Sequence, residues 1–403
     1  MRFVFFAVLL FSLSFASFGQ SEILMEKAWV ISCYDSNCRI DFDGILVVNG
    51  SSQNVLLITT EPEMDLNIDE NGEIHVVYNG TLDNEEIELK ASALVEIDYN
   101  TNIMKDPVLS EKYINSTELT EWDEDIAEEA EELAVRSSML ETIRNVVAWV
   151  HKNIIYDVSY FGKSRDAQTV YMEKRGVCVE YSHITIAMLN YLGIETRYVN
   201  GYVEVKEDVQ AHAWVEAYIP DYGWLPLDPT FSQVGILDSS HLIVSYGLDQ
   251  RTDYDKIISN KESAALMRLP TNVTIISMEE DAKNLSMEIT FNNQTYLASM
   301  NIRNERNDYV YGFYSFYPPV GYGDIETDLL LLSPNELRVR NYRFDPVIFA
   351  EGFVYTLPVR ASVNDVEASK TIIISKSRIE AEERTCPLAV ILLLAVIKFA
   401  YKK

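Results

Sequence analysis

Cys178, His212 and Asp228 are the residues of this sequence whose types and order fit thiol chemistry. Cys178 follows Gly176 and opens an apolar stretch that we expect to be a helix ending at Gly193, a typical helix stop. The partial positive charge of a helix N-terminus, together with a nearby imidazolium, can lower the pKa of a cysteine thiol from about 8.5 into the range of about 3.5–7.5. The thiolate would then be the resting nucleophile. The alternative is an inert buried cysteine that packs as a small hydrophobic side chain.

His212 and Asp228 are expected on two neighbouring strands. These strands are expected at residues 211–219 and 224–230. In thiol catalysis, a histidine takes and returns the proton, and a carboxylate holds the imidazole in one tautomer and orientation. A two-residue turn between the strands would place His212 opposite Phe231 instead of Asp228. The pairing therefore requires a wider loop or a β-bulge, for which Pro226 is a candidate.

The same chemistry requires an oxyanion hole with a donor besides the backbone N–H of Cys178. Gln168 and Tyr156 precede the cysteine in sequence and are candidate donors, although solvated polar side chains are the alternative for both. Trp214 and Trp224 are candidates for a wall that excludes water from the site, or for ordinary core residues. We assign no role to the other histidines.

The secondary structure predicted around these residues changes along the chain from strands to helices and back to strands. Residues 20–108 show short alternating apolar runs separated by Asn-Gly turns, which predicts a small N-terminal β domain. Residues 123–135 form an acidic stretch with helical spacing, and residues 140–154 add a second helix with one apolar stripe. Short strands with aromatic and β-branched residues return afterwards, so residues 265–376 are predicted to form a C-terminal β-sandwich.

Four motifs follow one another in the middle of the chain. They are Gly-x-Cys at residues 176–178, Gly-Ile-x-x-Arg-Tyr-Val-x-Gly-Tyr at 193–202, His-Ala-Trp at 212–214 and Gly-Trp-x-x-x-Asp-Pro-Thr at 223–230. Each motif alone has low specificity, but together and in this order they resemble the transglutaminase-like superfamily. The resemblance covers roughly the third of the chain between residues 123 and 250, and it does not extend to the flanking β regions.

The resemblance implies an α+β, papain-like core domain at residues 120–250, in which the helix that carries the cysteine packs on an antiparallel sheet between the two β domains. By resemblance, Cys178 is the acyl-accepting nucleophile, His212 the base and Asp228 the residue that orients it. The implied activity is that of a cysteine acyltransferase similar to protein-glutamine gamma-glutamyltransferases, or of a cysteine peptidase. Protein or peptide substrates are implied. Some members of the family use calcium, but no loop here has recognisable calcium-ligand spacing.

The composition excludes some classes of partner. The 403 residues include 62 acidic and 33 basic side chains, which gives a formal net charge of -29. This charge would repel the phosphates of nucleic acids, so no nucleic-acid partner is expected. The sequence contains no Gly-rich phosphate loop and no zinc-spaced cluster of cysteine and histidine, so no cofactor and no metal are predicted. The oligomeric state stays open.

The two ends of the sequence predict export and membrane attachment. Residues 1–19 combine a basic start, an apolar run and small residues, which is typical of a signal peptide. Residues 387–401 are predicted to be a C-terminal anchor, with the body of the protein on the extracellular side. The apolar run is shorter than the ~20 residues of an ordinary span, and a buried core helix is the alternative.

Two further features fit an exported protein. Cys33 and Cys38 are close in sequence and are expected to form a disulfide, whereas Cys386 could stay free, carry a lipid or bridge to another chain. Asparagine sequons, which would make the protein a glycoprotein, occur at Asn49, Asn79, Asn115, Asn272, Asn284 and Asn293.

Two classes of function are therefore compatible with the sequence. The first is a thiol enzyme that acts on amide bonds by acyl transfer to an amine or to water. The second is a surface scaffold or binding protein that keeps the triad residues without turnover. The presence of all three triad residues favours the enzyme, but fold resemblance alone does not decide function.

Overall fold

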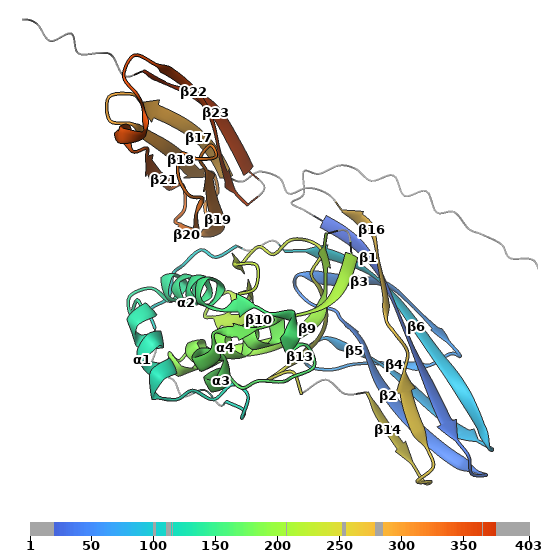
Figure 1. The fold of residues 1–403 in the computed structure, drawn as a ribbon. Helices are drawn as coiled ribbons and strands as arrows, with labels where there is room; N and C mark the ends of the chain where they lie inside the picture. Colours follow the sequence, from blue (N-terminus) through green and yellow to red (C-terminus); the bar gives the residue numbers. More distant parts are fainter. Residues whose placement is uncertain are drawn as a thin grey trace, which may run out of the picture.

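The structure is a computed structural model in which residues 20–375 are described, except for gaps at 100–101, 110–113, 115, 207, 252–254, 279–284 and 365. The described chain forms an N-terminal β part, a central part that contains all four of its α-helices, and a C-terminal β part (Figure 1). The predicted signal peptide and the predicted anchor at residues 387–401 lie outside the described residues. Within the described ranges, no helix has the length and apolar character needed to span a membrane.

The N-terminal β part consists of two sheets around one apolar cluster. One sheet has the order β15-β1-β6-β3 with β16 also paired to β1, and the other has the order β14-β2-β5-β4. Their strands are β1 (Gln20–Cys33), β2 (Cys38–Val48), β3 (Gln53–Glu61), β4 (Asp65–Ile68), β5 (Glu73–Leu82), β6 (Glu85–Asp98), β14 (Lys256–Ser259), β15 (Ala265–Arg268) and β16 (Asn272–Met278). Alternate residues of β6 are buried, which is the pattern of a strand with one face on a core.

The strands β14, β15 and β16 differ from the predicted domain boundaries. Residues 265–278 were expected to open the C-terminal domain, but they pair antiparallel with β1, for example Ile31 with Leu266 and Met25 with Val273 (Figure 1). The alternation of apolar residues identifies a strand but not its partner. β1 pairs with β6 along one edge, and the returning chain satisfies the backbone groups of its other edge. The C-terminal part therefore begins at β17 (Leu285–Asn292).

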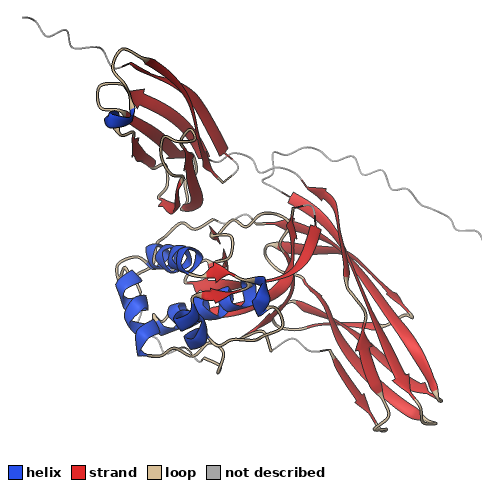
Figure 2. Ribbon diagram, viewed as in Figure 1, coloured by secondary structure: helices blue, strands red, loops and turns tan. Residues whose placement is uncertain are grey.

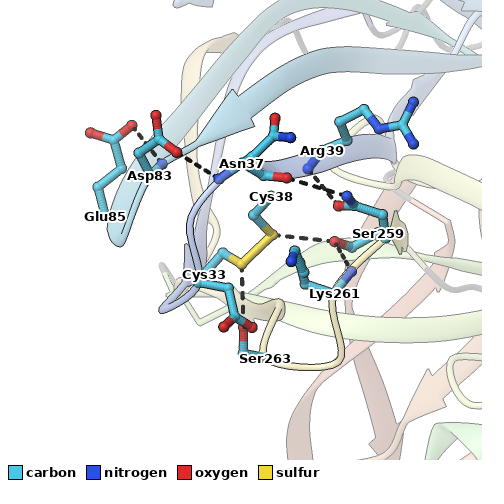
Figure 3. The surroundings of a disulfide bond; sticks show 11 residues. Cys33, Asn37, Cys38, Arg39, Asp83, Glu85, Ser259, Lys261 and Ser263 are labelled. Atoms are coloured by element: carbon cyan, nitrogen blue, oxygen red, sulfur yellow. Dashed lines mark hydrogen bonds between the residues drawn. A yellow bond between two sulfur atoms is a disulfide. The ribbon is translucent and has the colours of Figure 1, made fainter.

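The hairpin between β1 and β2 is closed by the expected disulfide between Cys33 and Cys38 (Figure 3). Both cysteines are fully buried. The sulfur of Cys33 lies 3.3 Å from the hydroxyl of Ser263, and the sulfur of Cys38 lies 3.3 Å from the hydroxyl of Ser259. The disulfide is thus covered by the chain that returns from the central part.

The central part contains a five-stranded antiparallel sheet with the order β12-β11-β10-β9-β13. Its elements are α1 (Glu124–Leu133), α2 (Met139–Asn153), α3 (Ala167–Glu173), α4 (Cys178–Tyr191), β9 (Thr196–Val205), β10 (Asp208–Ile219), β11 (Gly223–Asp228), β12 (Gln233–Val234) and β13 (Leu242–Gly247), with a short parallel pair β7 (Ile155–Tyr156) and β8 (Arg175–Gly176) and the 3₁₀ turn η1 (Val158–Tyr160). Nearly every residue of α4 is buried, because it contacts the other three helices as well as β9 and β10 (Figure 2). An apolar helix of this kind forms the centre of a domain core.

The two faces of this sheet pack against different parts of the molecule. Tyr198 and Val215 belong to the cluster that includes α4, whereas Val199 and Trp214 belong to the core of the N-terminal β part. Successive residues of a strand point to opposite faces, so β9 and β10 each contribute to both cores. The N-terminal β part is therefore packed directly on the sheet that carries His212.

The C-terminal part is a β-sandwich of a three-stranded sheet, β17-β18-β21, and a four-stranded sheet, β20-β19-β22-β23. Its remaining elements are β18 (Leu297–Asn304), β19 (Val310–Tyr317), β20 (Glu326–Leu332), β21 (Leu337–Arg343), β22 (Val354–Val363), β23 (Val366–Ser375) and the 3₁₀ turn η2 (Pro346–Ile348). The sandwich contacts α2 through a hydrogen bond of 2.9 Å from the Tyr311 hydroxyl to the carbonyl of Leu140.

Candidate active site

Cys178 is the first residue of α4, and the buried carboxylate of Glu180 holds this end of the helix in place. Glu180 accepts a hydrogen bond of 2.9 Å from the backbone N–H of Val177 and one of 3.3 Å from that of Arg165. A Cβ atom at Gly176 would lie 2.3 Å from the Cβ of Glu180, which explains the glycine two residues before Cys178. Cys178 has a free thiol and is 5% exposed.

His212 and Asp228 form a buried pair across the sheet. The Nε2 atom of His212 lies 2.7 Å from Oδ2 of Asp228, and their side chains are 5% and 0% exposed. The other carboxylate oxygen of Asp228 accepts hydrogen bonds from the backbone N–H groups of Thr230 at 2.7 Å and Phe231 at 3.1 Å. The Asp-Pro-Thr motif thus fixes the carboxylate so that one oxygen faces the imidazole.

The loop between β10 and β11 brings this pair together. Ile219 pairs with Gly223 and Val215 pairs with Leu227 without a register shift. The loop therefore has three residues, 220–222, which is the wider-loop alternative, and Pro226 pairs regularly with Glu216 instead of forming a bulge. In this register the side chains of residues 212, 214 and 228 share one face of the sheet.

The charge of Asp228 changes the proton affinity of His212. Burial lowers the pKa of His212, but the negative charge of Asp228 and the hydrogen bonds to Asp228 and Cys178 outweigh burial and raise this pKa to about 10. Burial raises the pKa of Asp228, but the positive charges and hydrogen bonds of His212 and His241 hold it well below its usual range. The geometry therefore favours an imidazolium and a carboxylate next to the cysteine.

Cys178 and His212 line the same cavity, which has a volume of about 320 Å³. The loop at residues 160–164, the side chains of Tyr198 and Asn200, and Gln250 complete the lining. The cavity is therefore formed by the N-terminus of α4, the strands β9 and β10 and the loop before α3. A substrate amide placed here would contact the thiol and the imidazole together.

Trp214 and Gln168 are not among the described residues that line this cavity. Trp214 is fully buried, and its ring stacks on His212 at 5.9 Å between centroids with an interplanar angle of 27°. It thus supports the imidazole from within the core of the N-terminal β part. Gln168 lies in the first turn of α3, and its oxyanion role stays a prediction. α3 starts with Asp166 as its N-cap, and this cap fixes the first turn where the sequence alone could not place it.

Tyr156, the other candidate donor, is likewise not among the described residues that line the Cys178 cavity. It belongs to β7, is 46% exposed, and its ring lies 6.1 Å from that of Tyr181, which follows Cys178 in α4. Burial, and after it the negative charges of Cys178 and Asp228, raise the pKa of Tyr156 to about 12. Its hydroxyl is therefore neutral and can donate a hydrogen bond.

His241 is a site residue that the sequence analysis did not identify. Its Nε2 atom lies 3.1 Å from the same Oδ2 atom of Asp228 that binds His212, and the side chain is fully buried. The ligand atoms of His212, Asp228 and His241 lie within 4.8 Å of one another, a spacing that could hold a metal ion. Each of these nitrogens already has a hydrogen bond to Asp228, so the arrangement is satisfied without an ion and we assign no metal ligands here.

One protein-family model matches the central part of the chain. Residues 127–229 match the model of the transglutaminase-like superfamily. This segment has a transglutaminase-like core. The match includes Cys178, His212 and Asp228 and confirms the resemblance seen in the motifs, whereas His241 lies outside it.

The relatives found by sequence are uncharacterized proteins. One from Mycobacterium leprae is 31% identical over 90 residues, which cover 20% of this chain and 32% of the relative. One from Mycobacterium tuberculosis is 25% identical over 161 residues, which cover 36% of this chain and 49% of the relative. The chain thus spans about a third to a half of the length of these relatives.

Some solved structures also align with parts of this chain. A putative cysteine protease from Cytophaga hutchinsonii aligns with a TM-score of 0.43 and 17% identity, over 66% of this chain and 93% of that chain. The periplasmic domain of TgpA from Pseudomonas aeruginosa aligns with a TM-score of 0.29 and 15% identity, over 49% of this chain and 88% of that chain.

The superfamily motifs have clear roles in the transglutaminase-like core. In the second motif, Gly201 is required because a Cβ atom there would lie 2.1 Å from the carbonyl oxygen of Leu242 and 2.4 Å from the ring of Trp214. The glycine thus lets β13 and Trp214 approach β9, directly opposite His212. The motif residues without chemistry of their own shape the space around the imidazole.

Proposed function

We propose that this protein is a thiol enzyme that cleaves amide bonds of protein or peptide substrates through an acyl-enzyme on Cys178. The observation that carries the proposal is the buried pair of His212 and Asp228, with Nε2 2.7 Å from Oδ2, in which His212 lines the cavity that contains the thiol. A buried imidazole that is oriented by a carboxylate and lies next to a free thiol is the arrangement that thiol catalysis requires.

In the first half-reaction, the Cys178 thiolate attacks the carbonyl carbon of the amide. The C–N bond breaks, the nitrogen leaves as an amine with the proton that His212 donates, and a thioester remains on the sulfur. The backbone N–H of Cys178 at the start of α4 and the hydroxyl of Tyr156 are the donors that we assign to the oxyanion. In the second half-reaction, neutral His212 removes a proton from water or from a primary amine, which attacks the thioester carbon. The C–S bond breaks, and the Cys178 thiolate and the His212 imidazolium are restored.

We further propose that the enzyme works outside the membrane as an anchored, glycosylated protein. The disulfide between Cys33 and Cys38 supports this because such bonds persist in oxidising compartments. The sequon asparagines at positions 49, 79, 272 and 293, which lie within the described ranges, are all exposed. The signal-like start and the apolar segment at 387–401 are the sequence features on which this proposal rests.

The proposal is tested with the purified protein, a glutamine-rich protein substrate and a biotinylated primary amine. Incorporation of biotin would indicate acyl transfer to amines, release of ammonia without incorporation would indicate deamidation, and new N-termini would indicate peptide cleavage. Cys178→Ala should abolish whichever of these is observed. His183→Gln is a matched control, because His183 is also fully buried and lies on α4 but does not contact Asp228.

Iodoacetamide separates an inactive scaffold from an enzyme whose substrate is missing from the assay. An activated thiolate would be alkylated rapidly at neutral pH, and His212→Ala would slow this reaction. If Cys178 reacts at the rate of an ordinary cysteine and His212→Ala has no effect, the enzymatic proposal is wrong and the scaffold alternative is correct.

A further inference from the structure

A second buried histidine shares the carboxylate that orients His212. His212 and His241 both direct Nε2 at the Oδ2 atom of Asp228, at 2.7 and 3.1 Å, and their ring centroids are 5.8 Å apart. His241 stands immediately before β13, which pairs with β9 on the side away from β10. The carboxylate therefore lies between two imidazoles, one from the central strand β10 and one from the residue before the edge strand β13.

The neighbours of His241 require a proton on both of its nitrogens. Its Nδ1 atom lies 3.1 Å from the backbone oxygen of Asp238 and 3.2 Å from the Oδ1 atom of the same residue. Both of these atoms are acceptors, and Nε2 faces the Asp228 carboxylate. A neutral imidazole would direct a lone pair at an acceptor in a fully buried position, which is unfavourable. His241 is therefore an imidazolium.

The charges around His241 agree with this assignment. Burial lowers the pKa of His241, but the charge of Asp238 and the hydrogen bonds to Asp228 and Asp238 raise it to about 9. Asp238 is held in turn by Ser240 and by a hydrogen bond of 3.1 Å from Gln233. The result is a line of alternating charge that runs from Asp238 through His241, Asp228 and His212 to the thiol.

The N-terminal β part covers His241, which is fully buried. The hydroxyl of Tyr99, which directly follows β6, donates a hydrogen bond of 2.9 Å to the backbone oxygen of His241, and its ring meets the imidazole edge-on. Trp214 and Phe231 cover the imidazole from the sheet side. Burial raises the pKa of Tyr99 well above its ordinary value, so this residue is neutral. The groups near His241 that carry charge are Asp228, Asp238 and His212.

We propose that His241 is a positioning residue of the thiol site. Asp238 holds His241, and His241 fixes the carboxylate of Asp228. Asp228 then neutralises two imidazolium ions and not that of His212 alone. This inference rests on the proposed thiol function, because it assigns His241 a role in the base of that mechanism. With His241 charged, Asp228 holds the proton of His212 less tightly, and His212 can release it to the leaving amine. When His241 loses its proton, His212 should bind its own proton more strongly.

The two imidazoles are therefore expected to titrate as a coupled pair with two steps on the alkaline side. A charge about 6 Å away at an effective dielectric of about 20 shifts a neighbouring pKa by about two pH units. The hydrogen bond from His241 joins a charged donor to a charged acceptor. Its loss is expected to slow the reaction of Cys178 about 10- to 100-fold.

The experiment is the pH profile of Cys178 alkylation by iodoacetamide on the purified full chain, combined with ring ¹⁵N NMR of histidine-labelled protein. Wild type should show two alkaline steps. His241→Gln keeps a donor but removes the charge, so it should lose the first step, leave the second near its wild-type pH, where His241 is already neutral, and slow alkylation at pH 7 about tenfold or more. His241→Leu, which lacks the donor as well, should be slower still.

Asp238→Asn keeps the proposal testable if the His241 variants fail to fold, because Asp238 is 43% exposed at its side chain. Loss of this carboxylate should move the first alkaline step to lower pH by at least about one unit, since Asp238 is the largest charge that favours the His241 imidazolium. The control His183→Gln removes another fully buried histidine and should keep both steps in place.

The outcomes separate this inference from the proposed function. Alkylation that depends on His212 but has the same alkaline steps in wild type, His241→Gln and Asp238→Asn would overturn the role of His241 and leave the thiol mechanism intact. Alkylation that does not depend on His212 would overturn both. A slower reaction in His241→Gln with an unshifted pH profile would reduce His241 to a packing residue and also overturn the proposal.

Discussion

Replacement of Asp228 by asparagine should reverse the protonation of His212 while the shape of the site is preserved. The backbone N–H groups of Thr230 and Phe231 donate to one carboxylate oxygen at 2.7 and 3.1 Å, so the amide oxygen of an asparagine must occupy that place. The amide NH₂ group would then take the position of Oδ2, opposite the Nε2 atoms of His212 and His241. The amide group has two N–H donors, one for His212 and one for His241. Each imidazole can accept only if its Nε2 atom carries no proton.

This forced geometry leaves His212 neutral, with its proton on the nitrogen that faces the thiol. Such an imidazole cannot accept the proton of Cys178 and cannot stabilise a thiolate. By analogy with triads in which the orienting aspartate is replaced by asparagine, the loss in turnover should be about 10⁴-fold, or roughly 5 kcal/mol of transition-state stabilisation. Asp228→Ala should lose less, because no amide then dictates the tautomer.

The assay is turnover of an amide substrate between pH 5 and 10, with iodoacetamide alkylation of Cys178 measured in parallel. Asp308→Asn is a matched control, because Asp308 is 3% exposed and ion-paired with Arg306 but lies in the C-terminal sandwich. The reasoning is refuted if Asp228→Asn stays within tenfold of wild type at pH 7, or if Asp228→Ala is the slower of the two variants. Either result would mean that the carboxylate does not decide the tautomer of His212.

Three further expectations follow from the same geometry. Cys178→Ala should abolish turnover and change the urea midpoint little, since the thiol faces a cavity; a large loss of stability would show that Cys178 is a core residue. Gly201→Ala should destabilise the fold by about 1–3 kcal/mol in urea unfolding and lower activity, because the new Cβ would lie 2.1 Å from a backbone oxygen of β13; an unchanged midpoint would contradict this. The raised pKa of His212, about 10, stabilises the folded state fully below its ordinary value of 6.5, and this contribution should be lost as pH rises toward 10; the lowered pKa of Asp228 gives stability that should be lost as pH falls below 3.8. Urea titrations at pH 3, 5, 7 and 9 should therefore give the highest free energy of unfolding near pH 5, and a monotonic rise up to pH 9 would contradict this.

The sequence motifs predicted the residues of the site because each motif is local. Gly176, Gly201 and the residues after Asp228 lie within a few positions of the chemistry that they shape, through one excluded Cβ atom or one turn hydrogen bond. Such short-range requirements appear directly as residue types at fixed spacing. The resemblance to the transglutaminase-like superfamily rests on these requirements, and the structure brings Cys178, His212 and Asp228 to one place for the same reason.

The loop between β10 and β11 shows where local inference reached its limit. The sequence left open whether His212 and Asp228 meet through a wider loop or a bulge, because Asp221 and Gly223 fit several turn geometries. Both residues adopt positive φ in the structure, at 66° and 113°. A shift of one residue in this loop would move Asp228 to the opposite face of the sheet from His212. The site therefore depends on one residue of loop length.

The long-range strand pairing could not be derived from the sequence. β16 carries the same alternation as a strand of the C-terminal sandwich, yet it completes the sheet of β1, far from it in sequence. β13 likewise pairs with β9 rather than with β12, its neighbour in sequence, and this pairing carries His241 to Asp228. A histidine before an apolar strand has no local signal that distinguishes a surface position from a place beside the triad carboxylate.

These two long-range pairings affect the same site. β13 carries the second imidazole to Asp228, and the N-terminal β part, which β14, β15 and β16 complete, places Tyr99 over that imidazole. Local motifs thus specify the nucleophile, the base and its carboxylate. Non-local pairing specifies how far water is excluded around these residues and which charged groups lie next to them. Because the strength of an electrostatic interaction depends on exclusion of water, the N-terminal β part should influence the base of the thiol site although it contributes no residue to the triad.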